Sequence, residues 1–541
     1  MCVCVCVCVW KPSQKIKINF STLDVLIIFS FLLVLISDLN SQLNQIGYAS
    51  LLLLYIIIRF SGKLNYTILY YSVLGASIIL SVTGYLQYSG LLNTQNEEYR
   101  VLGPFYNPAP YGCMISVFSS VIATVLIENK LLQLKKKIKY FSWAVFTLSI
   151  PVLVFANSRA SWLALFTAIL FAFFHKHKSA LIKMSVSKKV ILFVIALIVS
   201  FSIFSFLYDL RSESIKGRIL IWKISFKMIE DKPLFGFGNN GFEANYMNYQ
   251  AEFFKSNKGT EQEKILADNI RMAYNEPLRI TVEYGIFGLL LYSLVIYLVL
   301  IKTKNKNLVL VVSKSVLIVL LVFGLFSYPN QIFSIQAVAI IALGCLINTR
   351  KLKTIRLSIR TFSIRLLNAS IVLLLMLFMT FIFNQHKAYF KFQELLSPQN
   401  YLNDKKVLVK LKGLEKPLSK DALFLYYYCL ILGEKRKNSL LLEKMQLLER
   451  LSPTSSAYVL KGDCFSDIDR NEDAEKAYLK AYYMVPSLQL ARTKLAMLYK
   501  KQGKVTQAKA LAEEVLSEKV KFYGFQTYRL HQKLKEILEE N

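Results

Sequence analysis

Clustered metal ligands are scarce in this sequence. It contains four histidines and eight cysteines, and four of the cysteines lie in an N-terminal Met-(Cys-Val)4 tract. The other four show no metal-ligand spacing, and they are Cys113, Cys345, Cys429 and Cys464. Cys113 and Cys345 fall in apolar runs, where a thiol serves as a small apolar filler. The composition therefore favours chemistry without a bound metal.

A cleavable signal peptide is not expected either. The Cys-Val tract is short and lacks a basic start, so we expect no signal sequence before the first apolar run. Alternating Cys-Val is what an uninterrupted TG dinucleotide repeat encodes, which favours a slippage-prone start region or a misplaced start codon. We exclude the tract from fold prediction and assign residues 1–20 to a short cytoplasmic N-terminus.

Long apolar runs are abundant instead. Hydrophobic residues make up 54% of the 541 residues and the mean hydropathy is +0.40, which excludes a soluble protein of this size. About eleven segments approach the length needed to cross a hydrocarbon layer of roughly 30 Å. We therefore predict an all-α transmembrane bundle over 21–387, with spans at 22–38, 46–60, 66–88, 109–127, 139–156, 160–175, 190–208, 277–301, 307–328, 330–348 and 366–384.

The net charge of +31 is distributed along the chain in a way that argues against nucleic-acid binding. If the N-terminus is cytoplasmic, the inner segments carry 24 Lys and Arg residues, whereas the short outer loops carry only Arg100 and Arg159. Such an excess on one side is the positive-inside signal of a membrane protein. It predicts that the 209–276 loop and the C-terminal region lie outside the cytoplasm.

The composition changes after Asn384, and residues 388–541 are amphipathic with helical periodicity. Segment 455–488 matches a tetratricopeptide repeat at positions 8, 11, 20, 24, 27 and 32, and the next 34 residues repeat the pattern less completely. The matching residues are Gly462, Phe465, Ala474, Tyr478, Ala481 and Pro486. We predict a helical repeat domain over 388–541, with a plain helical hairpin as the alternative.

The most specific sequence motifs lie in the polar segment between two apolar spans. It opens with GRILIWKISFKMIEDKPLFGFGNNGF at Gly217 and closes with YNEPLRITVEYGIFGLL, ending at Leu290. This combination resembles the large periplasmic loop of the O-antigen ligase family, which also includes O-antigen polymerases and protein O-oligosaccharyltransferases. The resemblance implies a GT-C-like, multi-pass enzyme of the bacterial inner membrane. It would move a glycan from a polyprenyl diphosphate to an acceptor on the periplasmic face.

The resemblance implies a cluster of three arginines for the donor. Arg100 lies in EEYRVLGPFYNPAPYG, Arg159 in the Asn-Ser-Arg hairpin, and Arg218 shortly before Trp222. A guanidinium can hold phosphate oxygens through two hydrogen bonds, so three of them suit a diphosphate. The alternative is that Arg100 and Arg159 only anchor helix ends at the membrane surface.

The closing motif implies the acceptor side of the site. Tyr274 stands where the family usually has histidine, and none of His175, His177, His386 and His531 takes its place. We therefore expect Glu276 to act as the base, with Tyr274 and Asn275 beside it. Arg279 and Glu283 are four residues apart and share a helix face, so a structural ion pair is the alternative for Glu283.

The turn from Asp231 to Gly241 is rich in glycine but is not a nucleotide loop, because no strand precedes it and no Lys-Ser/Thr follows. Gly236 and Gly238 are expected to shape the loop under the diphosphate. We expect no cofactor. Expected partners are the lipid-linked donor, a lipid A core or protein acceptor, and a protein bound by the repeats.

O-antigen ligation is the leading prediction, since an outer repeat domain favours a macromolecular acceptor. Glycan polymerisation and transfer to protein remain alternatives. A lipid-linked glycan flippase is the alternative from another class, although charge at the bilayer midplane is typical of transporters and is missing here. A scaffold that only presents the repeats leaves the loop motifs unexplained.

Overall fold

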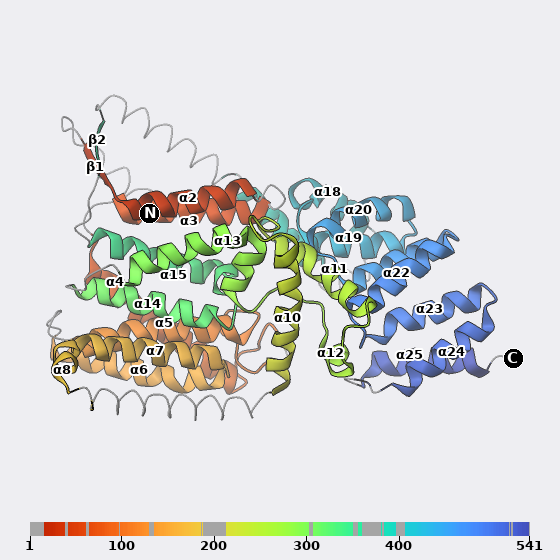
Figure 1. Ribbon diagram of the computed structural model, residues 1–541, viewed down its shortest axis with the longest axis horizontal. Coiled ribbons are helices and arrows are strands. Elements are labelled where there is room, and N and C mark those ends of the chain that lie inside the picture. The colour runs from red at the N-terminus through yellow and green to blue at the C-terminus, as the bar shows by residue number, and fades with distance from the viewer. Residues whose placement is uncertain are drawn as a thin grey trace.

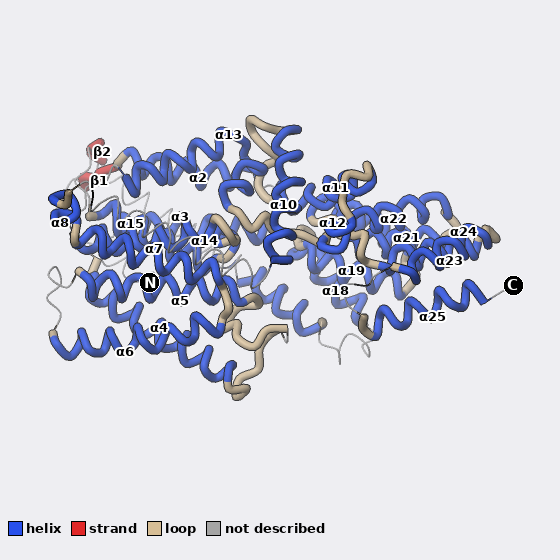
Figure 2. The backbone as a smooth tube through the Cα atoms, turned by 60° about the horizontal axis from the view of Figure 1, so that its bottom comes forward, coloured by secondary structure: helices blue, strands red, loops and turns tan. Residues whose placement is uncertain are grey.

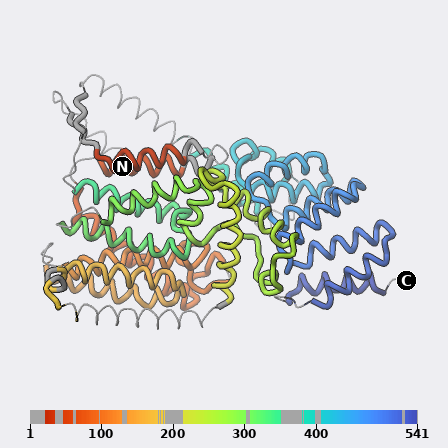
Figure 3. Tube along the Cα trace, viewed as in Figure 1, coloured from red at the N-terminus to blue at the C-terminus, as the bar shows by residue number. Residues whose placement is uncertain are grey.

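The computed structural model describes residues 16–37, 42–60, 64–96, 98–128, 135–185, 187, 212–301, 307–349, 355–359, 380, 383–396, 406–518, 520 and 523–539. Two blocks of helices lie one after the other along the long axis (Figure 1). The first block is a bundle of roughly parallel and antiparallel helices, and the second is an array of shorter helix pairs. The segment that follows residue 212 lies between them (Figure 3).

The bundle contains most of the expected spans. Its helices are α2 (Thr22–Ser37), α3 (Gln42–Phe60), α4 (Tyr66–Tyr88), α5 (Pro108–Ile127), α6 (Lys136–Phe155), α7 (Arg159–Lys176), α13 (Glu276–Ile296), α14 (Leu308–Gly324) and α15 (Phe333–Asn348). By length and composition, α4, α5, α6 and α13 with its continuation are able to cross a membrane, and α2, α3, α14 and α15 are shorter apolar helices. The expected span at 190–208, and nearly all of that at 366–384, lies outside the described residues.

Helix α5 forms the centre of the bundle. Of its apolar stretch, 94% is buried, whereas only 11% is buried in α13 with its continuation to Ile301. Small hydroxyl residues explain the close packing, because they let helices approach and can bond across them. Ser119 bonds to Ser149 at 2.8 Å, Thr124 donates to Ser315 at 2.9 Å, and the helix begins at Pro108 behind an Asn107 cap.

The connecting segment is helical. Helix α10 (Ser212–Asp231) runs across the end of the bundle, and α11 (Gly241–Lys255) and α12 (Glu261–Leu266) lead on to the second block (Figures 1 and 2). The remaining short helices of the first half are α8 (Lys178–Lys183), the π-helix η2 (Tyr297–Ile301) and the 3-10 helix η3 (Pro329–Gln331).

The C-terminal block consists of paired helices, as predicted. Residues 383–395 are helical and are followed by α18 (Val407–Leu418), α19 (Ala422–Glu434), α20 (Asn438–Leu451), α21 (Ser455–Asp467), α22 (Asn471–Met484), α23 (Gln489–Lys501), α24 (Val505–Ser517) and α25 (Phe525–Glu539). A Cβ at Gly462 would lie 2.4 Å from the Tyr478 ring, so only glycine lets α21 approach α22 this closely. Gly462 and Tyr478, two residues of the repeat pattern, are therefore in close contact.

One feature departs from an all-helical chain. Strand β1 (Ile16–Phe20) pairs antiparallel with β2 (Ile355–Ile359), with Ile18 opposite Leu357. Both segments alternate apolar and polar residues, which is typical of a strand, whereas a search for apolar runs of span length passes over them. The pair lies at the end of the bundle opposite α10 (Figure 1).

Candidate functional site

The start of α13 is built from the Tyr-Asn-Glu-Pro motif. Asn275 is the N-cap, and its side chain accepts from the Leu278 amide at 2.9 Å and donates to the Leu325 carbonyl at 3.2 Å. Tyr274 precedes it with φ of 52°, a left-handed conformation that is unusual for a bulky residue. The capped helix start and this strained residue turn the chain sharply where it enters the bundle.

A buried ionic cluster lies in the first turns of α13, directly after this turn of the chain. Arg279 contacts Glu276 at 2.9 Å and Glu283 at 2.5 Å, which confirms that the three residues share a helix face. Glu276 is 1% exposed and also accepts from the amide and the side chain of Asn330, at 3.0 and 3.2 Å. The cluster thereby joins α13 to the loop between α14 and α15.

Arg218 lies beside the Tyr274–Asn275 turn and is close to aromatic rings. Its guanidinium carbon is 5.4 Å from the centre of the Tyr274 ring, which packs edge-on against Tyr328 at 5.5 Å. Burial lowers the pKa of Arg218, the Tyr274 hydroxyl opposes this, and the positive charge of Arg159 lowers it further. Tyr99 interacts electrostatically with both Tyr274 and Tyr328, and burial raises the pKa of those two tyrosines.

Two of the three expected arginines therefore approach one another. Arg159 begins α7 and Arg218 lies on α10, yet their charges interact. Arg100 lies elsewhere in its loop: its Nε donates to the Tyr88 carbonyl at 2.9 Å, and its guanidinium covers the Tyr88 ring at 4.2 Å. The neighbouring residue Tyr99 interacts with Tyr274 and Tyr328 instead.

The glycine-rich turn and the middle of α13 interlock. The Phe237 and Gly238 amides donate to the Val282 and Glu283 carbonyls at 3.0 and 2.8 Å. Further along, the Ile286 amide donates to the Pro233 carbonyl at 2.8 Å. These carbonyls and amides leave the helical pattern because α13 breaks between them, at Gly285 with φ of 64° and ψ of −163°.

Glycine is required on both sides of this contact. A Cβ on Gly285 would lie 2.1 Å from the Leu234 carbonyl oxygen, and one on Gly236 would lie 2.5 Å from that of Glu283. The two glycine-containing motifs are therefore complementary halves of one joint. Trp222 of α10 stabilises the segment just before Tyr274, because its indole N–H donates to the Ala273 carbonyl at 3.2 Å.

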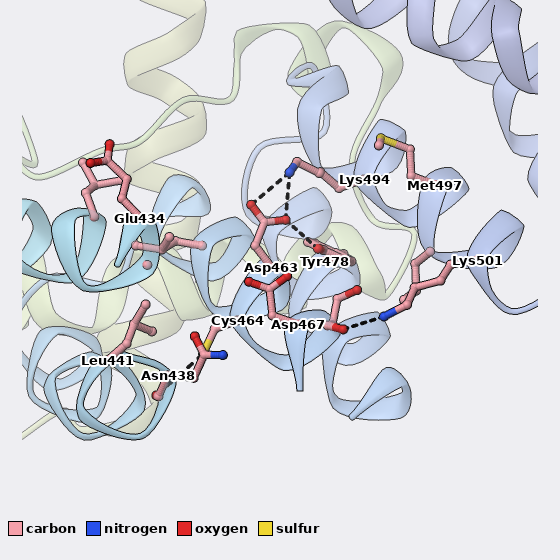
Figure 4. Close-up of a pocket in the computed structure, with 15 residues that line it drawn as sticks. Glu434, Asn438, Leu441, Asp463, Cys464, Asp467, Tyr478, Lys494, Met497 and Lys501 are labelled. Atoms are coloured by element: carbon pink, nitrogen blue, oxygen red, sulfur yellow. Dashed lines mark hydrogen bonds and ion pairs between the residues drawn. The ribbon is translucent and has the colours of Figure 1, made fainter. Parts of the chain in front are cut away.

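A separate groove of about 570 Å³ lies in the C-terminal block, lined by α19 to α23 (Figure 4). Asp463 pairs there with Lys494 at 2.9 Å and accepts from the Tyr478 hydroxyl at 2.6 Å. Lys501 pairs with Asp469, in the Asp-Ile-Asp sequence that ends α21. Within the described residues, no group of three or more His, Cys, Asp or Glu side chains is placed to hold a metal ion.

The comparison with protein families bears on the stretch that carries most of these features. Residues 144–293 match the O-antigen ligase family model. The match extends from α6 to α13, so it includes Arg159, Arg218, the glycine-rich turn and the Tyr274–Glu283 motif, and it confirms the resemblance there. The matched domain indicates membrane glycan transfer of the ligase or polymerase type.

The match ends before the C-terminal block, so the assignment of these paired helices to tetratricopeptide repeats stays a prediction. A search of curated proteins returned no match.

Three residues of the candidate site were not predicted from the sequence. Tyr99, Tyr328 and Asn330 all come from short loops that the structure brings to α13 and Arg218. The available signal was the Ser-Tyr-Pro-Asn-Gln run, which places polar residues in a short turn between two apolar segments. For Tyr99 the sequence offered no signal beyond its position next to Arg100.

Proposed function

We propose that this protein transfers a glycan from a polyprenyl diphosphate to an acceptor on the outer face of the inner membrane. The observation that carries the proposal is the approach of Arg159 and Arg218 beside the Tyr274–Asn275 turn. Two like charges held together in a partly buried place repel, and an anion between them relieves the repulsion. A diphosphate has the charge and the spaced oxygens to do so.

The reaction forms a bond between the acceptor hydroxyl oxygen and the anomeric carbon of the donor. The bond from that carbon to the diphosphate oxygen breaks, and the polyprenyl diphosphate leaves with the electron pair. Arg159 and Arg218 stabilise the charge that develops on the leaving oxygen. The proton of the acceptor passes to a base or to the departing diphosphate.

Glu276 is the base in the sequence-derived hypothesis. Its burial and its contacts with Arg279 and Asn330 favour a second role, in which the carboxylate anchors the turn that bears Tyr274 and Asn275. Both carboxylate oxygens already accept hydrogen bonds from Arg279 or Asn330, which leaves them little access to an acceptor hydroxyl. We therefore propose that Glu276 positions the turn, and that Arg100 contributes to the donor site less than Arg159 and Arg218.

Ligation of a glycan to the lipid A core is the activity we favour, with glycan polymerisation and transfer to protein as alternatives. The large C-terminal block suits a macromolecular acceptor. A flippase would need charged groups at the bilayer midplane, whereas Arg159 and Arg218 belong to a helix start and to the segment outside the bundle.

Deletion of the gene, followed by gel analysis of lipopolysaccharide and glycoproteins, tests the proposal. We expect undecorated lipid A core together with accumulated lipid-linked glycan. Loss of protein glycosylation alone identifies a protein transferase, and decoration by single units identifies a polymerase. Unchanged glycans in the deletion strain contradict all three activities.

A further inference from the structure

The segment from Ala267 to Asn275 runs along the C-terminal block before it enters the bundle. Its first part follows α12, and its last two residues are the turn next to Arg218. Ala267 and Ala273 are 2% and 1% exposed, so the segment is held at both ends and is not a surface loop. What holds it determines where Tyr274 and Asn275 lie.

Helix ends of the C-terminal block bind this segment. The Asn269 side-chain oxygen accepts from the Ser455 amide, which is the first amide of α21, at 2.9 Å. Gln250 of α11 is fully buried, and its amide nitrogen donates to the Asp268 carbonyl at 3.0 Å and to the carbonyl of Met484, the last residue of α22. First amides and last carbonyls have no partner within their own helix, so each of these bonds satisfies a group that is otherwise open.

An apolar core continues across the same boundary. It combines α11 residues with residues of α21 to α23 in one cluster that also contains Ala267 and Ala273. Its aromatic members are Phe242, Tyr246, Phe253, Phe254, Tyr458, Phe465 and Tyr478. A shared core of this kind holds its parts as one folding unit, unlike an appended module joined by a linker.

We infer that the C-terminal helical block is a structural part of the transfer site, because it fixes segment 267–275 and so positions Tyr274 and Asn275. Gln250 and Asn269 are the positioning residues. The inference rests on the proposed function for the reaction that is affected, but the position of the segment can be measured without substrate.

Hydrogen–deuterium exchange on the full-length protein in nanodiscs tests this. In Gln250→Leu and Asn269→Ala, we expect the amides of 267–275 to exchange about fivefold faster or more, which corresponds to the loss of one hydrogen bond of about 1 kcal/mol. With a polyprenyl-diphosphate glycan as donor, kcat should fall while the Kd of the donor stays unchanged. Asn269→Asp keeps the acceptor oxygen at a helix N-terminus and should restore both exchange and kcat.

Gln489 provides a matched control. It is also a buried glutamine, and its side chain bonds to the Val515 carbonyl near the end of α24 at 2.9 Å and to His531 of α25 at 2.8 Å, and not to segment 267–275. Gln489→Leu should lower Tm to a similar extent and leave both the exchange of 267–275 and kcat unchanged.

Unchanged exchange in Gln250→Leu and Asn269→Ala overturns the inference, and so does equal acceleration in Gln489→Leu. If the wild-type protein transfers no glycan but the exchange differs as expected, the proposed function fails and the positioning by the C-terminal block stands.

Discussion

Arg218 keeps its charge where two effects oppose it. Burial and the nearby charge of Arg159 both lower its pKa, and the Tyr274 hydroxyl compensates in part. The arrangement supports the proposed binding of a diphosphate. At the scale of single residues, the proposed donor site therefore depends on how two charges are held and not on a single reactive side chain.

Replacement of Arg218 by lysine tests the need for a guanidinium. Lysine keeps the charge but cannot offer two parallel hydrogen bonds, so kcat/KM should fall at least tenfold, or about 1.4 kcal/mol. The measurement is transfer from a polyprenyl-diphosphate glycan by purified enzyme. Arg470→Lys, at an exposed arginine of the C-terminal block 2.6 Å from Asp473, is the control and should retain activity. Full activity in Arg218→Lys would remove the proposed diphosphate contact.

Replacement of Glu276 by glutamine separates its two roles. As an anchor, the residue loses a charged hydrogen bond to Arg279, so stability should fall by about 1.5–3 kcal/mol together with kcat. Thermal unfolding and turnover are measured on the same samples. A loss of turnover of about 10²–10⁴-fold with unchanged Tm would instead identify Glu276 as the base.

At the scale of elements, the broken helix α13 and the glycine-rich turn depend on each other. Each glycine is required by a contact with the other motif, because a side chain at Gly236 or Gly285 would clash with the backbone of that motif. The break also directs Glu276, Arg279 and Glu283 inward on the first half of α13, while the second half presents Phe287 and Leu290 to the outside. The joint thus separates the buried ionic side chains from an exposed apolar surface.

Gly285→Ala should disrupt this joint. The added Cβ meets the Leu234 carbonyl and the residue keeps a positive φ, so we expect a loss of about 2 kcal/mol or more in stability and reduced transfer. Gly217→Ala in α10 is the matched control, since nothing lies within 4 Å of its added Cβ and alanine favours a helix. Equal stability of the two variants would show that the joint tolerates a side chain.

At the scale of the whole molecule, the segment that precedes α13 contacts the C-terminal block. Partly buried carboxyl groups lie at the same boundary. Asp421 caps α19 and accepts from the Phe424 amide at 2.7 Å, yet burial raises its pKa more than this bond and Arg271 lower it. Burial also raises the pKa of the neighbouring Glu243, which bonds to Ser452.

This arrangement predicts a pH dependence of stability. A carboxyl whose pKa is raised by folding holds its proton more tightly in the folded state, so stability falls as pH rises from the usual carboxyl pKa through the raised value. Asp421→Asn keeps the capping oxygen without the charge. Its Tm should exceed that of the wild type at pH 8 and match it near pH 4. A lower Tm at pH 8 would show that the charge stabilises the boundary.

The distribution of basic residues predicts the orientation of the molecule. Alkaline phosphatase fused after Asn384 should be active, since the C-terminal block is expected outside the cytoplasm, and fusion after Lys137 should be inactive. The opposite pattern would place the arginines on the cytoplasmic side, where the proposed donor is not presented.

The sequence by itself determined the helical class, the membrane bundle, the paired C-terminal helices and the stretch that matches the ligase family. These follow from local patterns, because apolar runs, small residues at fixed offsets and charge asymmetry each act within a few turns of chain. Arg159, Arg218 and the Tyr274–Glu283 motif could be singled out because they lie in segments that resemble the ligase family.

Only the tertiary structure decided how these pieces meet. It brought Arg218 to Tyr274 and Arg159 while Arg100 turned to Tyr88, and it enclosed Glu276 between Arg279 and Asn330. It also joined segment 267–275 to the ends of α21 and α22 through Asn269 and Gln250. These contacts join residues far apart in the chain, and they depend on which backbone groups are left open when each helix ends. No local sequence pattern predicts these contacts.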